Sequence, residues 1–326
     1  MKKQCIILGN CQAEALPSYL KLSNQFICAF EIVELPGIYR MSPQEFIDDH
    51  TVSLSQAGLL IYQPLSEKFG LLSSNFITSL ISDSCMKVSI PSLFFTGYNP
   101  EVAYLRDNTL KTLHYIDRIF WKLWTSGSQG KLPKKINSET LFPTWFSESC
   151  VRTSIEEAKS REISKDISIP MSDFIENNFQ KHRLFHVLNH PTSITMAELS
   201  NRILSHLGFT DRLPLNLKID EGVMKNFSFP IYNSHHRNLN LSFERGKHIY
   251  FEDLSVEKYI EIFSKRLDEI SSLIESQSHH MQFSFVPPVS RSEDHIIGEM
   301  ESELIFGSDT SGVLSRILMT IFPLRK

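Results

Sequence analysis

The sequence has no long hydrophobic run. None of its apolar stretches approaches the roughly 20 residues that a membrane-spanning helix needs. After Met1-Lys2-Lys3, the apolar stretch from Cys5 to Leu8 is too short for a signal peptide, and no cleavage site follows it. We therefore expect a cytoplasmic protein without a transmembrane segment.

Cysteine is scarce and its spacing follows no framework. The five cysteines are odd in number, widely separated and without a C-x-x-C pair: Cys5, Cys11, Cys28, Cys85 and Cys150. This pattern fits neither a set of disulfides nor a zinc site, so we expect no metal. A reduced compartment follows, and it leaves a thiol free for chemistry.

The chain also lacks an excess of basic residues and the common nucleotide-binding loops. Lys and Arg number 33 against 37 Asp and Glu, a net charge of -4. This balance argues against a nucleic-acid partner, and a basic cluster such as Lys131 to Lys135 is typical of a solvated surface. Neither G-x-G-x-x-G nor G-x-x-x-x-G-K-[ST] occurs, which disfavours ordinary dinucleotide or P-loop binding.

The first hundred residues alternate between strand and helix patterns. Apolar or β-branched runs predict strands over 3–8, 26–35, 57–62 and 86–95, and helices are expected after 11, after 43 and over 71–81. Alternation of this kind is typical of an α/β fold with a mostly parallel sheet flanked by helices. The 326 residues suffice for one large domain or two.

The rest of the chain predicts additions to this sheet. A helical insertion at about 107–182 is indicated by predicted helices over 107–124, 147–162 and 171–180. We expect a late strand at 183–188 after it, and then helices at 194–207 and 255–275. We therefore expect an α/β domain over 1–285 that includes the insertion, and a C-terminal extension over 286–326.

Cys11 follows the first predicted strand and begins the first helix. Gly9 and Asn10 allow unusual backbone angles, and Gln12 adds an amide beside the thiol. Backbone N–H groups at a helix N-terminus stabilise an anion, so we expect a more acidic, nucleophilic thiol, or a cradle for an oxyanion or phosphate. The alternative is a small buried residue in a turn.

Ligands of parallel sheets bind beyond the carboxyl ends of the strands. This rule gathers Gly9 to Gln12, Gln63-Pro64 and Phe95 to Asn99 at one edge, and His190 on the loop after the late strand is placed to meet Cys11. His114 and Asp117 would share a face of the helix predicted there, as a surface pair rather than a catalytic one.

Several short boxes occur in the order found in one known family. They are Gly9-Asn10-Cys11-Gln12-Ala13, Tyr62-Gln63-Pro64-Leu65, Ile90-Pro91-Ser92-Leu93, Gly97-Tyr98-Asn99-Pro100 and Asn189-His190-Pro191-Thr192. Over roughly residues 1–270 the chain resembles the WcbI-like acetyltransferases of capsular polysaccharide biosynthesis, which are similar to the SGNH hydrolase and acyltransferase fold.

The resemblance implies roles for these residues. Cys11 would be the nucleophile, His190 the general base and Gln63 an oxyanion-stabilising amide, with help from Asn10. Coenzyme A is the ligand associated with the family, so acetyl-CoA would be the donor and a saccharide hydroxyl the acceptor. The cofactor-binding positions implied by the same boxes are Gly9, Gln12, Tyr98 and Asn99.

One departure and several alternatives follow. The SGNH pattern has an Asp three residues before the His, where this chain has Val187, which leaves Asp117 as a candidate to orient His190. Loop candidates for the CoA phosphates are Arg40, Lys68 and Arg106. The sequence does not decide whether the acetyl group passes through an acetyl-Cys11 intermediate or directly to the acceptor. Two other readings stay open: a thiol esterase, and a non-catalytic CoA- or nucleotide-binding component of glycan assembly. The oligomeric state is open as well.

Overall fold

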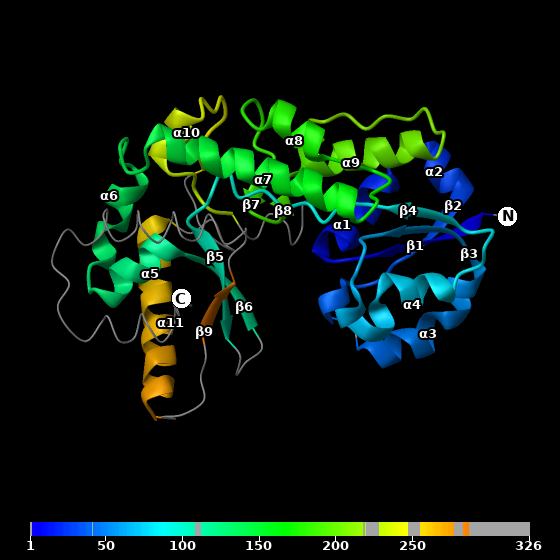
Figure 1. Cartoon of the computed structure of the whole chain (residues 1–326), viewed down its shortest axis with the longest axis horizontal. Coiled ribbons are helices and arrows are strands. Elements are labelled where there is room, and N and C mark those ends of the chain that lie inside the picture. Colours follow the sequence, from blue (N-terminus) through cyan, green and yellow to red (C-terminus); the bar gives the residue numbers. More distant parts are fainter. Residues whose placement is uncertain are drawn as a thin grey trace. The chain divides into compact units, whose positions relative to one another are not determined.

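The computed structural model describes residues 2–40, 42–107, 112–217, 219, 228–246, 255–276 and 283–286 (Figure 1). The chain divides into two compact units. The first unit comprises Met1–Phe94 and Ile155–Lys225, and the second comprises Phe95–Ser154 and Asn226–Lys326. Helix α7 (Thr144–Ser164) contributes residues to both units, and each unit is described separately below.

The first unit is built on a four-stranded parallel sheet. Its strands are β1 (Lys3–Leu8), β2 (Phe30–Val33), β3 (Ala57–Tyr62) and β4 (Met86–Ser89), in the order β2-β1-β3-β4. The pairing runs from Gln4 opposite Ala57 to Leu8 opposite Tyr62 between the two central strands. Both central strands are largely buried, which explains their near-continuous apolar sequences.

Helices cover both faces of this sheet (Figure 1). On one face, α3 (Pro43–Gln56) and α4 (Ser74–Ser79) join a core with Ile6, Leu8 and Leu60. The other face carries α1 (Cys11–Leu20) and α9 (Ser193–His206). The smaller elements of the first unit are α2 (Asn24–Ala29), η1 (Ile38–Arg40), η2 (Glu67–Leu72) and α8 (Ser172–Asn178). The expected α/β fold with a parallel sheet is therefore confirmed.

Three expected elements of the first unit are shorter or different. The strand expected over 26–35 is helix α2 followed by β2, because the Ser23 hydroxyl caps the helix by accepting a hydrogen bond from the Phe26 N–H. The helix expected over 71–81 is divided between η2 and α4, and Ser73 caps α4. The strand expected over 86–95 ends at Ser89, just before Pro91.

The second unit contains an antiparallel sheet instead of the expected long helix over 107–124. Its strands are β5 (Val102–Asp107), β6 (Thr112–Asp117) and β9 (Phe283–Val286), in the order β6-β5-β9. His114 and Asp117 thus lie in a strand and not on a helix face. The helix α5 (Arg118–Thr125) begins only where the Asp117 carboxylate accepts from the N–H groups of Ile119 and Phe120.

Other elements of the second unit are η3 (Gln129–Lys131), α6 (Leu132–Ile136), α10 (Asn233–Asn238) and α11 (Val256–Ser276), the last as expected. In the first unit, the late strand is β7 (Phe185–Val187), which pairs antiparallel with the two-residue β8 (His190–Pro191) rather than with the parallel sheet. Most of the extension expected over 286–326 lies outside the described residues, so the domain division stays a prediction.

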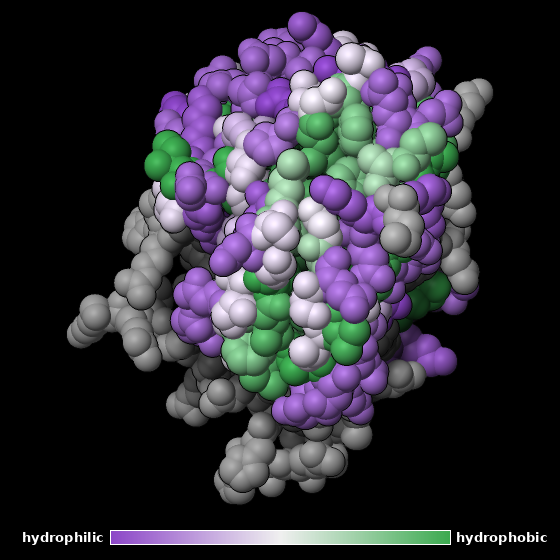
Figure 2. Space-filling model, turned by 90° about the vertical axis from the view of Figure 1, so that its right-hand side faces the viewer, coloured by the Kyte–Doolittle hydropathy of each residue, from purple (hydrophilic) through white to green (hydrophobic). Residues whose placement is uncertain are grey.

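Hydrophobic side chains also reach the surface. Figure 2 shows green, hydrophobic residues along the middle of one face, bordered by purple, hydrophilic ones. Among the described residues, large hydrophobic side chains are exposed on several helices, for example Val52 on α3 and Ile163 on α7. No helix among the described residues is both long enough and apolar enough to cross a membrane.

Candidate active site

The site begins where β1 ends and the chain turns into α1. Asn10 is the N-cap of this helix, and its Oδ1 accepts a hydrogen bond of 2.9 Å from the Gln12 N–H. The strands that follow β1 in sequence lie on opposite sides of it, β2 on one side and β3 on the other. The loops after β1 and β3 therefore flank a topological switch point, where α/β sheets usually bind ligands.

Cys11 and His190 lie together at this point. The Cys11 Sγ is 3.8 Å from the His190 Nε2, within hydrogen-bonding distance for sulfur. His190 belongs to β8, where it pairs with Val187 of β7, and it is only 2% exposed. The short β7–β8 ladder thus fixes the backbone that carries the imidazole. The structure brings together two residues whose meeting the sequence predicts.

Gln12 connects the loops around this pair. Its Nε2 donates to the carbonyl oxygens of Leu93 at 2.7 Å and Asn189 at 2.8 Å. Its Oε1 accepts from the Leu93 N–H at 2.9 Å and from the Gln63 Nε2 at 3.0 Å. All four hydrogen-bonding positions of the amide are used, and the side chain is buried. Gln12 therefore positions the Cys11 helix against the residue before His190.

Gln63 is held just as firmly. Its Oε1 accepts from the Asn10 N–H at 2.8 Å, and its Nε2 donates to Gln12 and, at 3.2 Å, to the Pro91 carbonyl. A Cβ on Gly9 would lie 2.4 Å from the Gln63 Oε1, so this contact requires glycine. Both amide hydrogens of Gln63 are engaged within the protein, so donation to an oxyanion requires that one of these bonds break.

Asn10 keeps a side-chain donor toward the solvent side of the site. Its Nδ2 donates to the Ser92 Oγ at 3.1 Å, and Ser92 is exposed. An amide nitrogen carries two hydrogens, so this group can serve a ligand without breaking the Ser92 bond. Ser92 belongs to one of the boxes in the sequence, but no local pattern indicates its role, because only folding places it against Asn10.

Burial raises the pKa of the Cys11 thiol to about 11. The N–H groups of Cys11 and Gln12 and the charge of Arg40 act in the opposite direction but do not offset it. Arg40 is itself paired with Glu14 in α1. The expectation of a more acidic thiol is therefore wrong for the resting protein. Cys11 is a protonated thiol at neutral pH, so it needs a base to become a nucleophile.

The remaining predicted residues belong to the second unit or to the surface. Tyr98 is buried against the rings of Phe95 and Phe243, and the Asn99 Nδ2 donates to the Glu101 Oε1 at 3.0 Å. Both lie in the second unit.

The other candidates are likewise distributed. Arg106 and Asp117 lie in the second unit, where the Tyr232 hydroxyl donates to Asp117 at 2.6 Å. Lys68 is exposed in η2 of the first unit.

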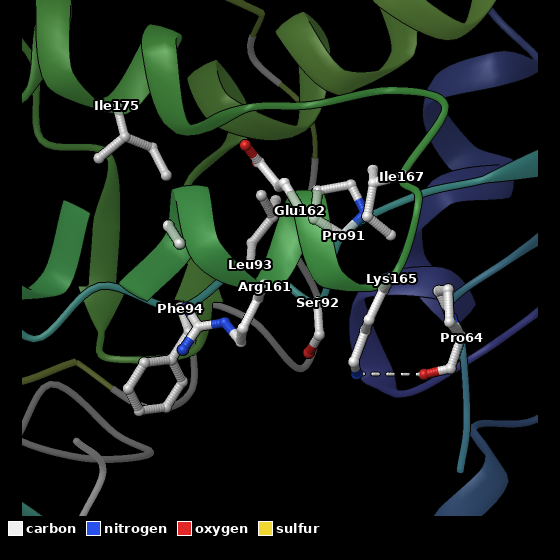
Figure 3. Close-up of a pocket in the computed structure, with 11 residues that line it drawn as sticks. Pro64, Pro91, Ser92, Leu93, Phe94, Arg161, Glu162, Lys165, Ile167 and Ile175 are labelled. Atoms are coloured by element: carbon white, nitrogen blue, oxygen red, sulfur yellow. Dashed lines mark hydrogen bonds between the residues drawn. The ribbon is translucent and has the colours of Figure 1, made fainter. Parts of the chain in front are cut away.

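A shallow pocket opens beside Ser92 (Figure 3). It encloses about 430 Å³, counted with its open mouth, and all its lining residues belong to the first unit. One wall is formed by α7, which contributes Arg161, and by Lys165, which directly follows that helix. Most of the other lining side chains are apolar. Both cations are distant from the Cys11 loop along the chain, so no pattern in the sequence indicates a role for either. The lining is completed by Pro64, Pro91, Leu93, Phe94, Ala158, Glu162, Ile167 and Ile175.

Among the residues that the structure describes, no group of three or more His, Cys, Asp or Glu side chains is placed to hold a metal ion. The site around Cys11 offers a thiol, an imidazole, side-chain amides and backbone N–H groups. These groups suit acyl transfer through a thiol nucleophile, with backbone N–H groups to stabilise an oxyanion.

Comparisons with known proteins agree with this architecture. The sequence model of a family described as "Polysaccharide biosynthesis enzyme WcbI" matches residues 4–212. The chain is also similar to a solved structure of WcbI, described as a novel polysaccharide biosynthesis enzyme in its native form without a disulfide bond between CoA and one of its cysteines. That likeness has a TM-score of 0.67 and 22% identity, and covers 82% of this chain and 89% of the other. A comparison with curated proteins gives no match.

Proposed function

The chain belongs to the WcbI family of polysaccharide biosynthesis enzymes, and from this premise we propose that it transfers an acetyl group from acetyl-CoA to a saccharide hydroxyl. The observation that carries the proposal is the 3.8 Å contact between the Cys11 Sγ and the His190 Nε2. A thiol with an adjacent base, at a helix N-terminus and at the switch point of a parallel sheet, is the arrangement that acyl transfer requires.

His190 acts as the general base. Because burial raises the pKa of Cys11 to about 11, the resting site holds a neutral thiol beside the imidazole. As the Sγ attacks the acetyl carbonyl, the His190 Nε2 accepts the Sγ proton. Collapse of the tetrahedral intermediate breaks the bond to the CoA sulfur, which takes that proton from His190. The products of this half-reaction are acetyl-Cys11 and free CoA.

The second half-reaction reverses the roles. His190 removes the proton of the saccharide hydroxyl, whose oxygen attacks the acetyl-Cys11 carbonyl, and Cys11 leaves and regains the proton. The first step exchanges one thioester for another, and the second forms an oxygen ester. Direct transfer, in which His190 deprotonates the saccharide and Cys11 forms no bond, uses the same base and differs only in the covalent intermediate.

The N-terminus of α1 stabilises the oxyanion. The Cys11 N–H faces its own sulfur closely enough to lower the thiol pKa, and the Asn10 Nδ2 retains a second hydrogen beyond its bond to Ser92. These two groups replace Gln63 as our preferred oxyanion donors, because the Gln63 amide already donates to Gln12 and Pro91. Gln63 is then a positioning residue that holds the loop.

The choice of acetyl-CoA rests on two points. The similar solved structure is described as being without a disulfide bond between CoA and a cysteine of that protein, a description that names CoA together with a thiol. In this chain, all five cysteines are free, and Cys11 is the one beside a base. We place the reaction in the cytoplasm, where thiols stay reduced, and the product in a capsular or surface polysaccharide.

The test is the intact mass of the protein after incubation with acetyl-CoA. We expect a gain of about 42 Da in the wild type, the mass of an acetyl group that replaces a proton. The gain should be absent from Cys11→Ala and strongly reduced in His190→Ala. Cys28→Ala removes an exposed cysteine and serves as the matched control, which should acetylate like the wild type.

Other outcomes have definite meanings. CoA-dependent stabilisation and saccharide acetylation without an adduct would favour direct transfer. Acetyl-CoA consumption that needs Cys11 but no saccharide would indicate a thiol esterase. An adduct that persists in Cys11→Ala, or full turnover in that variant, would overturn the nucleophile assignment. CoA binding without turnover in any assay would favour a binding component of glycan assembly.

A further inference from the structure

The pocket beside Ser92 carries two cations that the proposed chemistry at Cys11 does not use. Arg161 lies in the last turn of α7, and Lys165 directly follows the end of that helix, with its N–H donating to the Arg161 carbonyl at 3.1 Å. Figure 3 shows both lining the pocket, with Phe94 below Arg161 and Pro64 beside Lys165. A ligand that fits such a pocket carries an anionic group.

Arg161 is held in place at the pocket wall. Its guanidinium carbon lies 5.7 Å from the centre of the Phe94 ring, a cation–π geometry that limits its motion. Its ion pair with Glu157 is 3.6 Å long and partly exposed, and such pairs contribute little. The guanidinium therefore keeps donors available for an anion, for which its fork geometry is well suited.

Lys165 is the more mobile of the two cations. Its Nζ donates to the Pro64 carbonyl at 3.3 Å, a weak bond that leaves two hydrogens of the ammonium group available. The residue is exposed, so it can move toward a ligand. Pro64 directly follows Gln63, which connects this cation to the loop that supports Asn10.

The carboxylate in the pocket wall, Glu162, is engaged by other groups of the protein. Glu162 accepts hydrogen bonds from the N–H of Met171 at 2.7 Å, from the N–H of Ser172 at 2.9 Å and from the Ser172 hydroxyl. Its oxygens are turned toward the start of α8, and the residue is only 9% exposed. The exposed charge of the pocket is therefore positive, although the whole chain has a net charge of -4.

The pocket adjoins the reacting groups through Ser92. Its hydroxyl accepts from the Asn10 Nδ2 at 3.1 Å, and Asn10 directly precedes Cys11. The Ser92 O–H is free to donate into the pocket, which gives an anion a third, neutral donor. Most of the other lining side chains are apolar, which suits an organic phosphate ester better than a free inorganic ion.

We propose that Arg161, Lys165 and Ser92 form a phosphate subsite that orients a phosphorylated substrate toward Cys11. The proposal rests on the proposed function only for the identity of that substrate. The phosphate could belong to the acyl donor, as in CoA, or to a nucleoside diphosphate that carries the acceptor sugar. The shared chemistry is a phosphate group attached to an organic moiety, and the two sources are separated by experiment.

The test is isothermal titration of the full chain with three probes: CoA, pantetheine, which has no phosphate, and UDP. The variants are Arg161→Gln and Lys165→Gln, and Lys159→Gln is the matched control. Lys159 lies on the same helix and pairs with Glu176 at 2.7 Å, outside the pocket lining. Each variant removes one positive charge, from α7 or from the residue that directly follows it.

If the donor supplies the phosphate, Arg161→Gln and Lys165→Gln should each weaken CoA binding by about tenfold, the effect of one lost charge-assisted hydrogen bond. Pantetheine binding should be unchanged, and Lys159→Gln should match the wild type with every probe. Lys165→Arg should retain most of the affinity. A tenfold loss for UDP with no change for CoA would support the subsite and assign it to the acceptor.

The proposal is overturned if both variants bind CoA and UDP as the wild type does, or if Lys159→Gln weakens binding equally. It is also overturned if the wild type binds neither phosphate-bearing probe. The wild type could also bind UDP through Arg161 and Lys165 and yet neither bind CoA nor form an acetyl adduct. This result would contradict acetyl-CoA as the donor but would still support the phosphate subsite. Lys165 is exposed, so its variant reports on binding even if Arg161→Gln unfolds.

Discussion

At the scale of single residues, Gln12 explains how Cys11 and His190 meet. The two reactive residues are separated by 179 positions in the chain. Gln12 follows Cys11 directly and donates to the carbonyl of Asn189, which directly precedes His190. A buried amide with all its hydrogen bonds made is a strong constraint, because no bond can be lost without leaving a buried polar group unsatisfied.

We predict that Gln12→Ala destabilises the protein by about 3 kcal/mol or more, because it leaves the Leu93 N–H and two carbonyls without their partner. Acetylation of Cys11 should fall as well, although the thiol and imidazole are both present. Urea unfolding followed by circular dichroism gives the stability, and the adduct assay gives the reactivity.

The matched control is Gln25→Ala. Gln25 also makes several side-chain hydrogen bonds, to Thr210 and Asp211, but it is exposed and water can replace them. We expect a loss below about 1 kcal/mol. Equal losses for the two variants would contradict the role that we assign to burial at Gln12.

The residues of the pair were predictable, and their support was not. Cys11 is recognisable from an apolar strand that breaks at Gly9-Asn10, and His190 from its place after a late strand. The bonds of Gln12 join segments 81 and 177 residues apart, and no local pattern encodes such distances. The sign of the Cys11 pKa shift was also missed, because burial depends on packing that a sequence does not display.

At the scale of elements, helix α7 supports the pocket and organises the segment that follows it. The Glu162 carboxylate accepts from the N–H of Met171, the N-cap of α8, and from the N–H of Ser172, its first residue. These groups have no partner within their own helix, so a residue of another helix supplies the cap. The position of α8 thereby depends on one side chain of α7.

We predict that Glu162→Gln lowers the free energy of unfolding by roughly 1–2 kcal/mol, because the amide replaces one acceptor with a donor that faces other donors. Glu156→Gln, an exposed carboxylate on the same helix, should change stability by less than about 0.5 kcal/mol. Thermal unfolding of both variants against the wild type measures the difference. Similar shifts in the two variants would contradict the capping role.

The elements that were predicted correctly have strong local signals. Strand β3 is a run of apolar residues that ends at Gln63-Pro64, and α3 starts at Ser42-Pro43, a usual start for a helix. Strand β6, the partner of β5, lies inside the stretch 107–124 for which the sequence predicts a helix, because an aromatic-rich apolar stretch fits both periods. Their antiparallel pairing, from Val102 opposite Asp117 to Asp107 opposite Thr112, decides between the two.

At the scale of the whole molecule, the two units differ in what they bury. Each unit buries a histidine: His190 in the first unit lies beside Cys11, whereas His235 in the second unit lies among aromatic rings. His235 is fully buried, and its Nδ1 lies 2.7 Å from the Ser147 Oγ. Its ring stacks on Phe142 at 4.1 Å. Burial lowers the pKa of His235 to about 3, so the ring stays neutral at any ordinary pH.

We predict that this histidine makes the protein sensitive to acid. The unfolded chain protonates His235 near pH 6.5, whereas the folded chain does so only near pH 3. Between these values the unfolded state binds more protons, so the stabilisation is complete above about pH 6.5 and is lost as the pH falls toward 3. Each pKa unit corresponds to about 1.4 kcal/mol, so the loss reaches a few kcal/mol.

The measurement is the urea midpoint at pH 7.5 and at pH 4.5. His235→Asn, which has no ring to titrate, should be less stable at pH 7.5 but should lose less on acidification than the wild type. His206→Asn changes an exposed histidine of α9 and should keep the wild-type difference between the two pH values. If His235→Asn shows the same change in urea midpoint between pH 7.5 and pH 4.5 as the wild type, other groups determine the loss of stability in acid.

The burial of Cys11 also bears on survival under oxidants. Peroxides attack the thiolate, and oxidation beyond the sulfenic acid is largely irreversible. A thiol whose pKa is raised to about 11 presents almost no thiolate at neutral pH, so it reacts slowly with peroxide. A solvent-exposed thiol with a low pKa would be oxidised by the same peroxide. If Cys11 is the nucleophile that we propose, the fold keeps it in a form that reacts slowly with oxidants until His190 accepts its proton.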